Sequence, residues 1–120
     1  LSFDNNQLSF IESYTFESLN YLDELILSHN YLKKIDKNIF KGLKYLTQLN
    51  INHNFIEEIE EMNDLFNLKR LDLAHNKLEF LRANTFRKLL KLQFLNLEYN
   101  QINKISSFAF YGLNSLIKLK

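Results

Sequence analysis

The chain has 120 residues, 46% apolar and 24% charged, which is ordinary for one folded domain. With 15 basic and 14 acidic residues its net charge is +1, which gives no electrostatic reason to expect nucleic acid or an anionic membrane as a partner. It contains no cysteine, which excludes disulfides and thiolate zinc sites within these residues, and it shows neither a signal-peptide pattern nor an Asn-x-Ser/Thr sequon.

An asparagine recurs along the whole chain at intervals of 24, 24, 22 and 24 residues. Leucine or isoleucine recurs in phase with it, which divides the chain into repeating units. We expect a partial unit at 1–21, full units at 22–45, 46–67, 68–91 and 92–115, and a partial unit at 116–120. The repeated asparagines are Asn6, Asn30, Asn54, Asn76 and Asn100.

Each unit begins with the pattern of a short strand. In the first full unit Leu22, Leu25 and Leu27 precede Asn30, and the alternation of Leu25 and Leu27 with polar or exposed positions is typical of a half-buried strand. One coil cannot bury its leucines alone, so we expect stacked coils that form one parallel sheet. The asparagine amide follows the strand and is suited to satisfy backbone groups at the bend.

A second column of large side chains fills the far side of each coil. Phenylalanine recurs at Phe16, Phe40, Phe86 and Phe110, and we expect these rings to form a buried spine. The 46–67 unit is two residues shorter and carries Met62 in that region, where the flexible thioether can fill irregular space. We expect a local change of curvature there.

These residues and spacings resemble the leucine-rich repeat family over the whole chain. The 24-residue unit with its phenylalanine is similar to the animal "typical" subtype of Toll-type receptors, adhesion receptors and matrix proteins, and the short unit is similar to an intracellular subtype. The resemblance implies an α/β solenoid: a horseshoe segment with a parallel concave sheet, one short strand per coil, and a convex side that is mostly irregular, 3-10 or short helix. Because neither end carries a cap, we expect an internal piece that frays or self-associates alone.

The resemblance also implies a function. It favours a non-catalytic protein-binding module in the extracellular or cell-surface ectodomain of a Toll-like or adhesion receptor, with a protein ligand or co-receptor as partner. We expect no cofactor, no nucleic acid and no direct membrane contact in this segment. An intracellular scaffold or regulatory subunit, and a secreted matrix protein, remain as alternatives, the first supported by the short unit and the absence of sequons.

The side chains expected on the concave sheet change from acidic through neutral to basic along the chain. Asp23 and Glu24 stand in the first full unit, and Lys69 and Arg70 stand two units later. Ile26 and Phe94 are expected to be exposed on this polar sheet, where apolar residues are candidates for partner contact. Ile26, Arg70 and Phe94 are therefore candidate binding residues.

All three histidines precede a repeat asparagine, and Tyr99 holds the same position one unit later. A straight column of imidazoles suits tetrahedral zinc poorly, whereas a pH sensor is chemically simpler, and a repeated filler residue is the plainest interpretation. Tyr31 and Phe55 follow the asparagines and add aromatic surface of a kind favoured at interfaces. The candidates on this margin are His29, Tyr31, His53, Phe55, His75 and Tyr99.

A block of charged residues and the lack of catalytic motifs complete the sequence pattern. Lys33, Lys34 and Lys37 align with Glu57, Glu58 and Glu61 one unit later, and we expect exposed pairs between coils that favour the correct register. Catalysis is disfavoured, because no phosphate-binding, zinc-protease or redox motif occurs, and because neighbouring residues such as Ser28 and His29 are expected to point in different directions in a strand.

Overall fold

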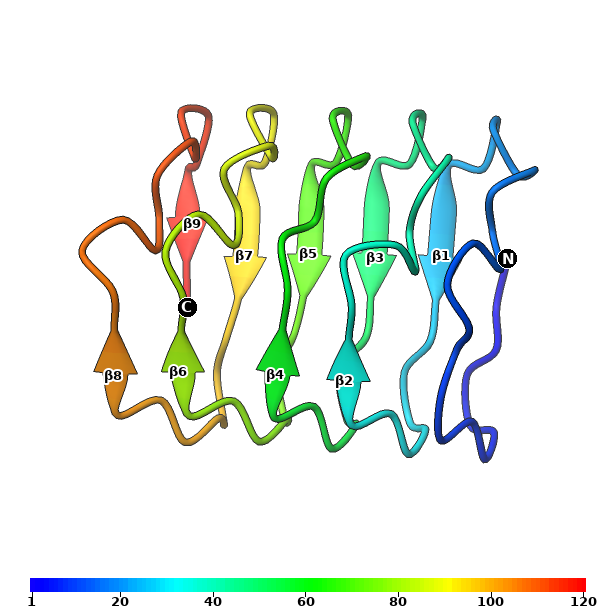
Figure 1. The fold of residues 1–120 in the computed structure, drawn as a ribbon, viewed down its shortest axis with the longest axis horizontal. Coiled ribbons are helices and arrows are strands. Elements are labelled where there is room, and N and C mark those ends of the chain that lie inside the picture. The colour runs from blue at the N-terminus through cyan, green and yellow to red at the C-terminus, as the bar shows by residue number, and fades with distance from the viewer.

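The coils stack side by side, and each contributes a strand to one parallel sheet that runs the length of the molecule (Figure 1). The computed structural model describes all residues, 1–120. Leu25, Leu49, Leu71 and Leu95 lie in register on neighbouring strands, and all four are buried. The sheet order is β1 (Glu24–Ile26), β3 (Gln48–Asn50), β5 (Arg70–Asp72), β7 (Phe94–Asn96) and β9 (Lys118–Leu119).

A second row of two-residue strands lies beyond the bends, and the repeat pattern did not predict it (Figure 1). These strands form two separate pairs, β2 with β4 and β6 with β8, so the row is interrupted between β4 and β6. The interruption falls where the short unit ends. The strands are β2 (Lys34–Ile35), β4 (Glu58–Ile59), β6 (Phe80–Leu81) and β8 (Lys104–Ile105).

The rest of each coil consists of hydrogen-bonded turns, and no residue is helical. The solenoid with a parallel sheet is thus confirmed, and its convex side is irregular, so the α/β label proves too broad. No helix is long and apolar enough to cross a membrane.

A single apolar core runs through the stack. Phe16, Phe40 and Phe86 are buried in it, and Phe110 is half-buried with its ring 6.4 Å from that of Phe86. Met62 is buried in the same cluster and occupies the unit that lacks a phenylalanine. The core therefore continues through the short unit without a break.

One asparagine amide per coil joins that coil to the one before it. Asn54 is buried: its Oδ1 accepts from the Leu32 N–H at 3.0 Å, and its Nδ2 donates to the carbonyls of Leu27, Ile51 and Asn52. Asn30, Asn76 and Asn100 repeat the same four bonds with their own neighbours. Asn6 is exposed and bonds only the carbonyls of Phe3 and Asp4.

The predicted charge block pairs only in part. Lys34 lies in register with Glu58 but makes its closer contact, 2.9 Å, with Glu60, while Glu61 pairs with Arg87 of the following unit at 3.4 Å. The expected pairing of Lys33, Lys37, Glu57 and Glu61 across these coils was wrong, since none of these side chains forms an ion pair between them. The register was right, but a two-residue strand turns alternate side chains to opposite sides.

Replacing Asn54 tests whether the amide holds the coils together. In Asn54→Ala the three carbonyls keep other donors, from Asn30, Asn76 and the His29 N–H, but the Leu32 N–H loses its partner. We expect the free energy of unfolding to fall by about 2–3 kcal/mol, as for a buried donor left unpaired. Urea unfolding followed by circular dichroism measures this.

Two further variants sharpen this test. Asn54→Asp keeps an acceptor for Leu32 but turns a carboxylate oxygen toward carbonyl oxygens, so we expect it to cost more than alanine does. Asn114→Ala replaces an exposed asparagine that is not one of the repeated asparagines, and it should leave the free energy of unfolding unchanged. If all three variants are equally stable, the hydrogen bonds of the Asn54 amide contribute nothing to the stability of the fold.

Candidate functional site

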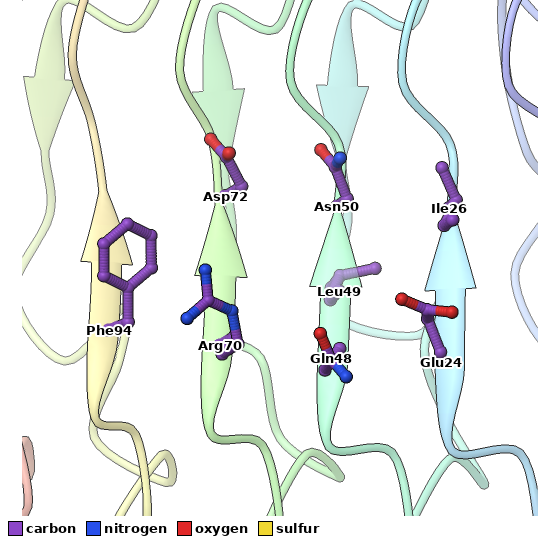
Figure 2. A pocket seen from close by; sticks show the side chains of 8 residues that line it. All are labelled: Glu24, Ile26, Gln48, Leu49, Asn50, Arg70, Asp72 and Phe94. Carbon is purple, nitrogen blue, oxygen red and sulfur yellow. The ribbon is translucent and has the colours of Figure 1, made fainter.

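The outward face of the five-stranded sheet, called the sheet surface below, carries aligned rows of side chains. Glu24 lies in register with Gln48, Gln48 with Arg70, and Arg70 with Phe94. Figure 2 shows this row, with Ile26, Asn50 and Asp72 two residues further along β1, β3 and β5. Together they line a shallow depression of about 160 Å³ between Glu24 and Phe94.

Arg70 and Phe94 are in direct contact on the sheet surface. The guanidinium lies 4.6 Å from the centre of the Phe94 ring, which is the geometry of a cation–π interaction. Phe94 and Ile26 lie on the outward face as expected, but they are half-buried, so they are less exposed than the sequence pattern indicated. Stacking on the ring holds the charge of Arg70 in place while leaving its N–H groups open.

The second polar row serves the backbone. Asn50, Asp72 and Asn96 each accept, through Oδ1, a hydrogen bond at 3.0–3.1 Å from the amide two residues later. This is the local bond by which Asn and Asp stabilise turns. These side chains shape the bend and are less free to contact a partner than the row from Glu24 to Phe94.

The histidines stand on left-handed turns. His29, His53, His75 and Tyr99 have φ of 51–56°, and Asn5 has φ 54° at the same position. Asparagine and histidine are enriched in this region among residues other than glycine. The repeat of the histidine therefore has a conformational cause that spacing alone did not reveal.

Because the turns repeat, their rings stack into a column. The ring centres of His29 and His53 are 4.4 Å apart, those of His53 and His75 4.1 Å, and those of His75 and Tyr99 4.2 Å. The rings lie face to face, so their nitrogens do not converge on one point. No group of three or more His, Cys, Asp or Glu side chains has metal-binding geometry.

Asp4, which the sequence pattern did not single out, joins two residues expected to diverge. Its Oδ1 accepts from Ser28 Oγ at 2.6 Å and lies 3.1 Å from His29 Nδ1. The pKa of Asp4 is lowered mainly by the hydrogen bond from Ser28 and, to a smaller extent, by the hydrogen bond from His29. The expectation that Ser28 and His29 point apart in a strand was wrong, because both residues lie past the end of β1. No hydrogen bond links Ser28 to His29, however, so the two side chains do not form a nucleophile–base pair.

Tyr31 and Phe55 form a second, shorter row on the same margin. Their ring centres are 5.9 Å apart, and the ammonium of Lys77 lies 4.9 Å from the Phe55 ring. Both rings, together with His29 and His53, line an open groove of about 440 Å³. The structure thus brings four of the six candidates on this margin to one groove, with His75 and Tyr99 continuing the column beside it.

We expect the column to make the stability of the fold depend on pH. Stacking covers both faces of the His53 ring, although the residue as a whole remains exposed. The resulting partial desolvation, with the nearby His75 and His29, lowers the pKa of His53, and Asp72 opposes the shift. A histidine with a lowered pKa in the folded state binds its proton more readily when unfolded. Its contribution is therefore present above about pH 6.5 and is lost as the pH falls toward the lowered value.

We expect His53→Asn, which tolerates the left-handed turn, to lose less stability than the parent protein between pH 7.5 and 5.5. Thermal unfolding at both pH values measures the difference. Phe66→Leu, at an exposed aromatic outside the column, should keep the parental pH dependence. If His53→Asn and the parent lose the same stability on acidification, His53 does not titrate in this way.

Comparison with known proteins supports the architecture. The leucine-rich repeat family model matches residues 1–62 and 66–120, and the gap between the matches falls in the short unit. No curated protein sequence matches the chain. Among solved structures, the crystal structure of a TLR13–ssRNA13 complex superposes with a TM-score of 0.66 at 32% identity, covering 99% of this chain.

The match to TLR13 covers only 21% of that receptor chain, so the present chain spans about a fifth of its length. The family resemblance inferred from the repeat is nevertheless confirmed over nearly every residue, as is the similarity to a Toll-type ectodomain. Repeats of this kind are binding modules, and the serine, histidine and aspartate that meet at Asp4 lack catalytic geometry. The chain belongs to the leucine-rich repeat family.

Proposed function

We propose that the chain is a ligand-binding part of a Toll-like receptor ectodomain, and that its sheet surface contacts a protein ligand or co-receptor. The observation that carries the proposal is a division among the side chains. Leucines fill the core and asparagines join the coils, whereas Glu24, Arg70 and Phe94 lie in one row on the sheet surface and do neither. Arginine and aromatic side chains are favoured anchors at protein interfaces.

The proposal includes a location. Similarity to a Toll-like receptor supports a place on the extracellular or luminal side of a membrane, with any anchor outside these residues. The alternative of an intracellular scaffold is supported by the short unit and by the absence of sequons and cysteine, and that of a secreted matrix protein by the repeat subtype. The 32% identity to TLR13 across the whole chain favours the receptor.

Nucleic acid is the second candidate ligand. Its exclusion depended on the net charge of +1, which is a weak ground, and the similar TLR13 structure is a complex with single-stranded RNA. The mixed charge of the sheet surface still favours protein, since phosphates would meet Asp23 and Glu24 as well as Lys69 and Arg70.

Substitution of Phe94 tests the proposal. The full-length protein, displayed on cells, is screened against secreted proteins and single-stranded RNA. For the ligand so found, we expect Phe94→Ala to weaken binding by about tenfold or more, as for an interface anchor. The change is measured by titration of labelled ligand.

Tyr111→Ala provides the matched control, because this exposed aromatic lies in a turn far from the sheet surface in the coil. It should leave binding unchanged. Equal affinity of the parent, Phe94→Ala and Tyr111→Ala for the ligand would show that the sheet surface is not its site.

A further inference from the structure

Opposite charges pair beside the two-residue strands, but they do not pair in the row from Glu24 to Phe94. Beside the two-residue strands, charges from neighbouring units pair: Lys34 with Glu60 at 2.9 Å, and Arg82 with Glu58. In the row from Glu24 to Phe94, by contrast, Glu24 and Arg70 form no ion pair, although both are exposed. Asp23 and Lys69, which directly precede these two strands, are also exposed and form no ion pair, and Asp23 accepts a hydrogen bond from Thr47.

A neutral coil explains why these charges stay apart. Gln48 lies in register between Glu24 and Arg70, so carboxylate and guanidinium stand two strands apart, about 10 Å. That separation is close to the screening length of physiological salt, and the two charges attract each other weakly. Both therefore remain available to a partner.

Each unpaired charge has an apolar neighbour. Ile26 lies beside Glu24 on β1, and Phe94 stacks on Arg70 (Figure 2). One shallow depression connects the two ends and is lined by all four residues. The depression thus has the unpaired carboxylate of Glu24 at one end and the guanidinium of Arg70 toward the other, with apolar contact area at each end. Asp72, the second charged residue of β5, also lines it, but its Oδ1 accepts the Ala74 N–H.

We propose, building on the function above, that the sheet surface binds a protein segment carrying a basic and an acidic side chain two residues apart. The basic group lies over Glu24 and Asp23, the acidic group lies over Arg70 and Lys69, and an apolar side chain contacts Phe94. In an extended segment, alternate side chains point to the same side about 7 Å apart, and flexible lysine or arginine stems reach the remaining distance.

Charge complementarity selects this partner over a polyanion. A nucleic acid strand that binds Lys69 and Arg70 would also bring its phosphates close to the carboxylates of Asp23, Glu24 and Asp72, which repel them. A dipolar segment is attracted at both ends, and the reverse placement would set like charges together. The partner is therefore one whose contact segment has the pattern basic–x–acidic.

The experiment uses the full-length protein and four probes at low salt. Three are synthetic heptapeptides built around Lys-Leu-Glu, Glu-Leu-Glu and Lys-Leu-Lys, each with a further leucine two residues after the last charge so that an apolar side chain faces Phe94. The fourth is decauridylate RNA. We expect the Lys-Leu-Glu peptide to bind best, and Glu24→Gln and Arg70→Gln each to weaken it about threefold to fivefold, the effect of an exposed ion pair. Isothermal titration calorimetry gives the affinities.

Glu57→Gln and Lys44→Gln are the matched controls, because each removes an exposed, unpaired charge outside the sheet surface. Neither should change peptide binding. The sign of the Glu24→Gln effect decides the partner, since removing a carboxylate weakens a dipolar segment and strengthens a polyanion.

Two results would overturn the inference, and they differ in what they leave standing. If Glu24→Gln tightens binding of the Glu-Leu-Glu peptide or the RNA, and these bind better than Lys-Leu-Glu, the surface binds polyanions and remains a ligand site. If neither Glu24→Gln nor Arg70→Gln changes the binding of any probe, and Phe94→Ala leaves the ligand of the full-length protein unaffected, the proposed function fails as well.

Discussion

One asparagine amide per coil determines how each coil sits on the one before it. At Asn54 the oxygen accepts the Leu32 N–H of the preceding coil, and the nitrogen donates to carbonyls of both coils. The bend after each strand exposes these groups, and water is excluded from it because the amide is buried. Register between coils, and so the alignment of every surface row, follows from this arrangement.

The same bend accounts for the column of imidazoles. The residue before each asparagine takes a left-handed conformation, and a ring placed there in successive coils must stack on its neighbours. The column is thus a consequence of the repeated turn and is not by itself evidence of a site. Stacking between His29 and His75 nevertheless lowers the pKa of His53, mainly through desolvation of its ring.

Sequence periodicity predicted the features that depend only on which side chains face the core. The strand leucines, the asparagine interval and the phenylalanine spacing are of this kind. It did not predict the sign of φ at His29, the contact of Asp4 with Ser28, or the closer pairing of Lys34 with Glu60 than with Glu58. These depend on backbone dihedrals and side-chain directions within one turn, which an apolar pattern does not encode.

Length variation is absorbed away from the sheet surface. The 46–67 unit lacks two residues, yet β3 pairs with β5 in the same register as every other neighbour in the sheet. The interruption appears on the other side, between β4 and β6, where Arg82 pairs with Glu58 across the gap. Strand pairing and core leucines hold the sheet together, whereas the turns on the other side have no continuous strand pairing that a shorter unit would disrupt. A binding row from Glu24 to Phe94 therefore stays continuous across a unit of different length, and its side chains can vary without disturbing the asparagine bonds beneath them.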